Sequence, residues 1–234
     1  MPWEAPPTSR VLAALPLFSQ VPELLLEVVG EAAQRVRLRR GQVLFRRGDP
    51  CTGFFVVLRG QMKLALGSAD GNEKVLEIIG PGESFAEAAM FAGRPFPVTA
   101  SALEAGDLLA VPSRAVDALL DADPAFARRM LAGLSARLHT MVADVGAMAL
   151  HSGTQRVIGF LLGELGPAAD PAPEGGGGRV RLPVGKAVLA SRLSLTPETF
   201  SRVLRLLSEQ GLLSVRGREV VVHDPGALAG YSGG

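Results

Sequence analysis

The spacing of hydrophobic residues changes several times along the 234-residue chain. Short apolar clusters at 15–19 and 22–29 predict two short helices, after a Pro-rich and polar stretch at 1–9 that we expect to be flexible. From Arg35, apolar residues alternate with other residues in short runs, separated by Gly41, Gly48, Gly60, Gly71 and Gly82. Such alternation with regular turns is typical of a β-sandwich or roll. Asp70-Gly71-Asn72 is a good hairpin turn within it.

Helical spacing returns near Ser113 and then continues from about Pro124 to Leu150. Its apolar residues fit a heptad over nearly four repeats, which is typical of a parallel coiled coil and predicts a homodimer. The predicted seam consists of Leu131, Leu134, Leu138, Met141, Val145 and Met148, with Ala127 at its start. The alternative is a core helix that packs on its own roll.

A third pattern occurs between Thr196 and Gly211. Thr196 can cap a helix, Pro197 suits its first position and Glu198 favours the positive end of its dipole. Phe200, Val203, Leu204 and Leu207 then recur at steps of three or four and form one apolar face, and Gly211 ends the helix.

The neighbours of this helix predict a winged helix-turn-helix. Residues 185–192 form a short helical pattern, 193–195 a tight connection, and 212–222 a hairpin centred on Gly217. In such folds the second helix enters the DNA major groove. An ordinary amphipathic helix is the simpler interpretation of 196–211 alone, but it does not explain the order of helix, turn, helix and wing.

The charge distribution agrees with DNA binding. Segment 179–218 holds eight basic and two acidic residues, a net charge of +6, so the remainder of the +1 chain has −5. Positive charge is therefore concentrated where phosphates would lie.

Several classes of protein are excluded or disfavoured by composition. No apolar run reaches the length of a membrane span, and the N-terminal residues lack a secretory pattern, so we expect a cytoplasmic protein. The single cysteine, Cys51, cannot form an internal disulfide or hold a cysteine-ligated cluster, and is interpreted as a packing residue.

Residues 166–178, with four consecutive glycines, predict a flexible loop, and the polar break at 151–154 predicts a hinge.

With roll, long helix and winged helix in this order, residues 12–224 resemble the CRP/FNR superfamily of bacterial transcription regulators. The motifs that carry the resemblance are Gly41-Gln-Val-Leu-Phe-Arg-Arg-Gly-Asp49, Pro81-Gly-Glu-Ser-Phe-Ala-Glu87 and the stretch at 195–202. Within the superfamily the chain looks most like the Dnr subgroup, which regulates denitrification genes in response to nitric oxide; 85–91 and 134–139 add to this likeness.

The resemblance implies an α+β fold in three parts. These are a cyclic-nucleotide-binding-like jelly roll with flanking helices at 1–123, a dimerisation helix at 124–150 and a winged helix-turn-helix at 151–234. It also implies double-stranded DNA, a second copy of the chain and RNA polymerase as partners, an activator role and no enzymatic activity.

The family pattern Glu-x-x-Ser-Arg, which reads a TTGAT half-site, is present as Glu198, Ser201 and Arg202. Arginine can donate a fork to guanine, and glutamate can accept from cytosine. The full set expected at DNA is Lys186, Thr196, Pro197, Glu198, Thr199, Ser201, Arg202 and Arg205. A solvated charge pair is the alternative for Glu198 and Arg202.

The resemblance also bears on the sensor. Cyclic AMP is not expected, because Pro97 and Val98 stand where cyclic-AMP-binding members have an Arg-Ser pair, and Ala86 replaces a glycine. One cysteine excludes an iron–sulfur cluster. Haem is a candidate cofactor, with His139 or the amino group of Pro2 as axial ligands. A small effector would bind between Phe85, Glu87 and Met90 on the roll and Leu134, Leu138 and Met141 on the long helix.

Three functions remain in competition. The first is a homodimeric regulator switched by a small effector, with nitric oxide acting through haem as one version. The second is a ligand-independent DNA-binding regulator whose roll is a scaffold. The third is a cupin-like metal enzyme, which the absence of histidine before His139 disfavours.

Overall fold

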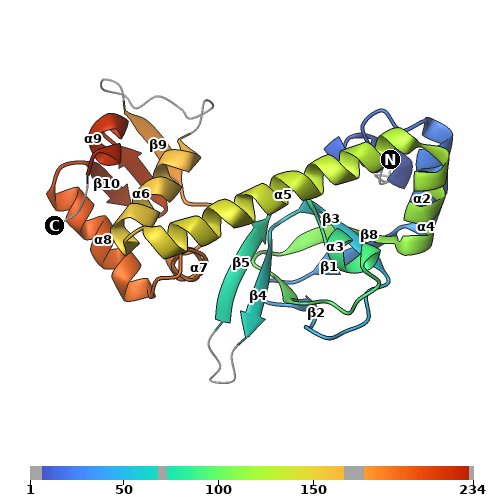
Figure 1. The fold of residues 1–234 in the computed structure, drawn as a ribbon, viewed down its shortest axis with the longest axis horizontal. Helices are drawn as coiled ribbons and strands as arrows, with labels where there is room; N and C mark the ends of the chain where they lie inside the picture. Colours follow the sequence, from blue (N-terminus) through green and yellow to red (C-terminus); the bar gives the residue numbers. More distant parts are fainter. Residues whose placement is uncertain (1–6, 68–72, 166–176, 232–234) are drawn as a thin grey trace, which may run out of the picture. The chain divides into compact units, whose positions relative to one another are not determined.

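The computed structural model describes residues 7–67, 73–165 and 177–231, and the chain divides into two compact units, 1–139 and 140–234 (Figure 1). The long helix α5, Pro124–Leu150, contributes to both units. Its bounds are those predicted from the heptad. The predicted α+β class, with a β-roll, a long helix and a C-terminal helix-turn-helix, is confirmed.

The first unit contains two antiparallel four-stranded sheets. One has the order β1-β8-β3-β6 and the other β2-β7-β4-β5. The strands are β1 Gln34–Leu38, β2 Val43–Phe45, β3 Gly53–Arg59, β4 Met62–Gly67, β5 Glu73–Ile79, β6 Ser84–Phe85, β7 Thr99–Ala102 and β8 Gly106–Pro112. The predicted turn at 70–72 lies outside the described residues, between the paired ends Gly67 and Glu73 of β4 and β5.

Strand β3 separates two hydrophobic cores. Phe54 and Val56 face helices α1, α2, α4 and the start of α5, whereas Val57 faces the interior between the sheets, together with Phe45 and Phe85. Alternate side chains of a strand point to opposite faces, so a strand covered on both sides is apolar at successive positions. The run Gly53-Phe-Phe-Val-Val-Leu58 meets this requirement.

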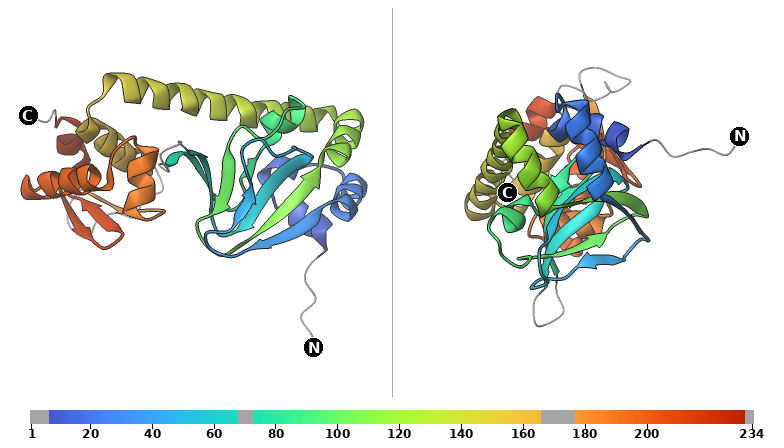
Figure 2. Two further views of the ribbon diagram at one scale, coloured as in Figure 1. Left: turned by 90° about the horizontal axis from the view of Figure 1, so that it is seen from below. Right: turned by 90° about the vertical axis from the view of Figure 1, so that its right-hand side faces the viewer.

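Helices cover one side of the roll, as Figure 2 shows. They are α1 Thr8–Ala13, the 3-10 turn η1 Pro16–Phe18, α2 Glu23–Ala32 and α4 Ser113–Ala122, with the start of α5. Helix α3, Glu87–Phe91, instead buries Ala89 in the core between the sheets. The expectation that all of 1–9 is flexible was wrong for Thr8 and Ser9, which begin α1 because Leu12 is buried in the core. Predicted helix 15–19 is only the short turn, and α3 was not predicted.

The second unit begins within α5 and ends in a winged helix. Its elements are α6 Gly153–Glu164, β9 Gly178–Arg181, α7 Lys186–Arg192, α8 Pro197–Glu209, β10 Leu213–Arg216, β11 Glu219–Val222 and α9 Pro225–Ala229. The predicted wing is confirmed, but β11 pairs with both β10 and β9, so the sheet has three strands. Most of the expected loop 166–178 lies outside the described residues, and Gly178 belongs to β9.

Candidate DNA-binding surface and sensor site

Helix α8 presents one buried and one exposed face. Its cap is formed as predicted, because the Thr196 hydroxyl accepts a hydrogen bond from the amide of Thr199 at 3.2 Å and Pro197 follows as the first helical residue. The predicted apolar residues Phe200, Val203, Leu204 and Leu207 are buried. At the other end, Gly211 has φ +70°, which glycine adopts without strain.

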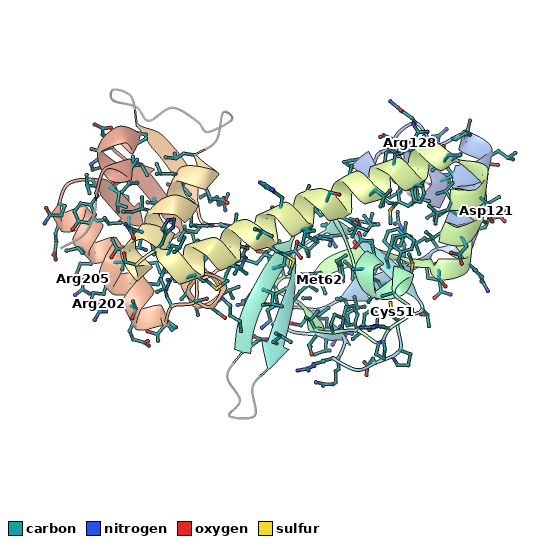
Figure 3. All side chains as sticks on the ribbon, in the orientation of Figure 1. Cys51, Met62, Asp121, Arg128, Arg202 and Arg205 are labelled. Carbon is teal, nitrogen blue, oxygen red and sulfur yellow. The ribbon has the colours of Figure 1, made fainter. Side chains whose placement is uncertain are left out.

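The exposed face of α8 carries the predicted reading residues. Glu198, Ser201, Arg202 and Arg205 are all exposed, and Figure 3 labels Arg202 and Arg205 on this helix. Hydrogen bonds from its own backbone amide and from the Thr196 hydroxyl lower the pKa of Glu198. The Glu198 carboxylate therefore stays ionised at neutral pH and can accept hydrogen bonds.

The turn between α7 and α8 is fixed by Arg156 of α6. Its guanidinium donates to the carbonyl oxygens of Leu193 at 2.9 Å, Ser194 at 3.3 Å and His151 at 2.8 Å. Ser194 has φ +57°, an uncommon conformation for a residue with a side chain. Arg156 thus binds two carbonyls in the turn that sets the direction of α8, and one at His151, between α5 and α6. Sequence reasoning missed this role, because the contact joins residues 37 positions apart.

Two of the eight basic residues counted above are used within the second unit. Arg192 forms an ion pair with Asp144 at 2.5 Å. Arg218 donates to the carbonyl oxygen of Leu182 at 3.0 Å and also to that of Pro183. Arg179, Arg181 and Arg216 are exposed, and Lys186 is half-buried at the start of α7. The charge available to phosphates is therefore smaller than the sequence count.

The second candidate site is a charged cluster in the first unit, centred on Arg137 of α5. Its guanidinium contacts Glu77 of β5 at 2.7 Å, Glu87 of α3 at 3.3 Å and the carbonyl oxygen of Ser84 at 2.7 Å. The Glu87 side chain is only 5% exposed, whereas that of Arg137 is 26% exposed. A carboxylate so deeply buried needs a cation, and Arg137 supplies it.

Arg137 was not among the predicted site residues. Its place three residues after Leu134 puts it on the same helix face as that predicted pocket residue, but this spacing does not identify Glu87 as its partner. The structure thus joins this segment of the roll to the long helix through a salt bridge.

The predicted pocket residues have different environments. Phe85 is fully buried and packs against Phe45 and Phe55, with ring centroids 6.2 and 5.4 Å away. Met90 and Leu134 are half-buried, whereas Leu138 and Met141 are exposed. Among the residues that the structure describes, only Glu87 of the predicted set takes part in the Arg137 cluster.

Helix α5 has a conspicuous exposed apolar stripe. It includes five predicted seam residues, and Val142 and Leu150, which were not predicted, are exposed as well. The exposed fractions are 62% for Leu131, 63% for Leu138, 52% for Met141, 64% for Val142, 64% for Val145, 39% for Met148 and 81% for Leu150.

The described residues contain no cluster of side chains that could hold a metal ion. No three His, Cys, Asp or Glu side chains among them lie close enough to hold a metal ion. His139 is exposed on α5, and Pro2 lies outside the described residues.

Cys51 is half-buried and its thiol donates to the Gly53 carbonyl at 3.3 Å. Burial raises the pKa of the Cys51 thiol, so it stays protonated. No helix within the described ranges could cross a membrane.

Comparisons with known proteins agree with this arrangement of two domains. The cyclic nucleotide-binding domain family matches residues 35–123, and the Crp-like helix-turn-helix domain family matches 155–231. Together they define a DNA-binding regulator with a sensory domain. The chain belongs to the CRP/FNR family of transcription regulators.

Two relatives illustrate the match. The transcriptional activator protein anr of Pseudomonas aeruginosa is 27% identical over 94% of this chain and 88% of its own length. A CRP-like cAMP-activated global transcriptional regulator of Mycobacterium tuberculosis is 28% identical over 94% of this chain and 97% of its own. The structure of FixK2 from Bradyrhizobium japonicum superposes with a TM-score of 0.73 at 22% identity, covering 86% and 98% of the two chains, and shows the shared fold.

Proposed function

We propose that this regulator acts as a homodimer that reads a palindrome of TTGAT-like half-sites through α8. The observation that carries the proposal is the capped helix with Glu198, Ser201 and Arg202 on its exposed face and an apolar face buried behind them. Arg202 is the donor suited to guanine, and Glu198 the acceptor suited to cytosine. Thr196, Pro197, Thr199, Arg205 and Lys186 complete the proposed contact set.

The test is a selection of bound sequences from randomised duplex DNA, followed by titration of the selected site. Arg202→Ala should cost about 1–3 kcal/mol on that site and relax the preference at one base pair. Arg114→Ala, which removes an exposed arginine of α4 in the first unit, is the matched control. It should change neither the affinity for the selected site nor the base preference. If Arg202→Ala weakens specific and random DNA equally, Arg202 contacts phosphate and the reading role is wrong.

Dimerisation is proposed through the apolar stripe of α5. Side chains as large and exposed as Leu138 and Val145 cost free energy in water, and a second copy would bury them. Leu138→Asp would place a charge in this seam without a partner, so light scattering should report a monomer. Leu24→Asp changes a residue of α2 that is 72% exposed, and should leave the dimer intact. A stable dimer of Leu138→Asp would locate the interface elsewhere.

The roll is proposed as the sensor of a small effector, and the Arg137 cluster as the place where α5 responds to it. A ligand shifts such an equilibrium only through different affinities for the two states. An effector that displaces Glu87 or Arg137 would bind the two states with different affinities, because the cluster joins α3, β5 and α5. The predicted contacts Met90 and Leu134 are half-buried, and the fully buried Phe85 would support the site from behind.

Nitric oxide acting through haem is one version of this sensor. Its test is the absorption spectrum of protein purified after haem supplementation, in which a Soret band would support it and a colourless protein would contradict it. If the operator affinity is the same with every effector tried, the alternative of a roll that serves only as a scaffold is favoured. Activation through contact with RNA polymerase, in the cytoplasm, completes the proposed function.

A further inference from the structure

Besides the helix-turn-helix, the chain has a second concentration of positive charge. Residues 34–50 hold six arginines and one aspartate, a net charge of +5. With +6 at 179–218, the remaining residues of this +1 chain amount to −10. We call the six residues the arginine strip: Arg35, Arg37, Arg39, Arg40, Arg46 and Arg47.

The strip follows two edge strands of the roll and the turns after them. Arg35 and Arg37 lie on β1, an edge of the first sheet, and project from its solvent side because Val36 and Leu38 turn inward. Arg39 and Arg40 are in the turn to β2, where the Gln42 amide donates to the Arg39 carbonyl at 3.0 Å. All six arginines are exposed.

Most of these charges have no counter-charge within the part of the chain that the structure describes. Arg37 is the strip's one ion-paired member there, 3.5 Å from Asp107, and Arg59 shares that carboxylate at 3.2 Å. Asp49 uses its carboxylate to accept from the backbone amide of Arg46 at 2.8 Å. Guanidinium groups without a counter-charge repel one another where they are close, so binding an anionic partner lowers the free energy of such a segment.

The partner's chemistry follows from what the strip lacks. A docking surface for a protein normally has a core of aromatic or aliphatic side chains inside its polar rim. Among described residues 34–50 there is no exposed large hydrophobic side chain. A segment whose exposed charged residues are six arginines and one aspartate fits the phosphate backbone of DNA, which is recognised by charge and without base contacts.

We propose that the arginine strip binds the phosphate backbone of DNA that flanks the operator. This rests on the proposed recognition of the operator by α8, because the bound operator supplies the flanking DNA at high effective concentration. The strip adds affinity and salt dependence without sequence preference. Charged side chains also protect sheet edges from pairing with other chains, but that role does not require the arginines of the two turns.

The experiment compares two duplexes with the same selected site, one of about 24 bp and one of about 70 bp with random flanks. The variant replaces Arg35, Arg40 and Arg47 with Gln. The matched control replaces Arg10, Arg114 and Arg128, which are exposed arginines elsewhere in the first unit, so both proteins lose three charges. Melting followed by circular dichroism checks that both fold as the wild type does.

We expect the wild type to bind the long duplex more tightly, and the strip variant to lose this advantage while binding the short duplex within about twofold of the wild type. Three phosphate contacts, each with a salt slope of about 0.9, correspond to about a 40-fold change in affinity between about 50 and 200 mM salt. The control variant should retain the advantage and the slope.

Three results would overturn the proposal. The first is that the wild type binds the short and the long duplex with equal affinity. The second is that the strip variant and its control lose equal affinity for the long duplex. The third is that the strip variant keeps its affinity for DNA but no longer supports transcription by purified RNA polymerase. The last result would assign the strip to an acidic protein. Absence of any sequence-selective binding by the wild type would instead refute the proposed function itself, so the two failures are distinguishable.

Discussion

Arg137 holds a buried carboxylate, and removing it should destabilise the first unit. In Arg137→Ala, Glu87 would keep its buried position, with a side chain 5% exposed, but lose its cation. Breaking a fully buried ion pair on one side costs about 3–5 kcal/mol. Because Arg137 and Glu77 are 26% and 32% exposed, water can replace part of the lost interaction. We therefore expect a loss of about 2 kcal/mol.

The assay must follow the first unit separately, because a chain with two compact units need not unfold in one step. Cys51 provides the probe: it is the chain's only cysteine, lies in the roll and is half-buried. Pulse labelling of its thiol along a urea gradient reports the opening of the roll. The control is Arg128→Ala, an exposed arginine of the same helix (Figure 3), which should stay within about 0.5 kcal/mol of the wild type.

A double-mutant cycle then identifies the partner. Glu87→Gln keeps the shape of the side chain but removes its charge, so the combined variant should lose less than the sum of the single losses, by about 1–2 kcal/mol. Arg137→Lys should fall between wild type and alanine, since one ammonium cannot reproduce a planar fork that reaches three acceptors. The reasoning is refuted if Arg137→Ala and wild type have the same urea midpoint, or if the two substitutions are additive.

Two other predictions concern backbone positions. Ala86 has φ +77°, which costs an L-residue about 1–2 kcal/mol. Ala86→Gly should therefore raise the stability of the roll by about 0.5–1 kcal/mol in the Cys51 assay. Ala88→Gly, at an exposed position of α3, should lower it. Arg156→Ala should remove three hydrogen bonds to backbone carbonyls, loosen the turn before α8 and weaken operator binding by about 2 kcal/mol. Arg156→Lys should be close to alanine. An unchanged operator titration would mean that the turn before α8 does not depend on Arg156.

The sequence predicts best those elements whose causes are local. Helix α8 is delimited by Thr196 and Gly211, and its apolar spacing lies within four turns, so cap, core face and end all agree with the structure. The long helix is similarly determined by its own periodicity. Helix α9 has an equally local signal, since the Asp224 side chain accepts from the amides of Gly226 and Ala227 and Pro225 follows it, yet this signal was overlooked.

Other features depend on contacts between distant residues and leave little trace in the local pattern. Strand β9 is only four residues long and is stabilised by pairing with β11, about forty residues later. Glu87 and Arg137 are fifty positions apart, and nothing in the spacing around either residue indicates the other. The resemblance therefore predicted an effector site near Glu87, whereas the Arg137 cluster was found only in the structure.

Arginine illustrates why a charge count alone does not define a binding surface. Arg137, Arg156 and Arg192 are half-buried and donate to carboxylates or backbone carbonyls, so they position α5 and the turn before α8. Arg202 and Arg205 are exposed on α8 and available to an incoming ligand. The two groups are alike in composition but differ in whether an acceptor lies within the protein. A guanidinium that already has such an acceptor must give it up before it binds phosphate, which lowers the gain, whereas an unpaired one binds with only the cost of its hydration. Within the described residues, Arg202, Arg205 and most of the arginine strip are exposed without such an acceptor, whereas Arg192 and Arg218 have one. Exposed arginines such as Arg114 meet the same condition, so exposure is necessary for a proposed DNA contact but does not by itself define one.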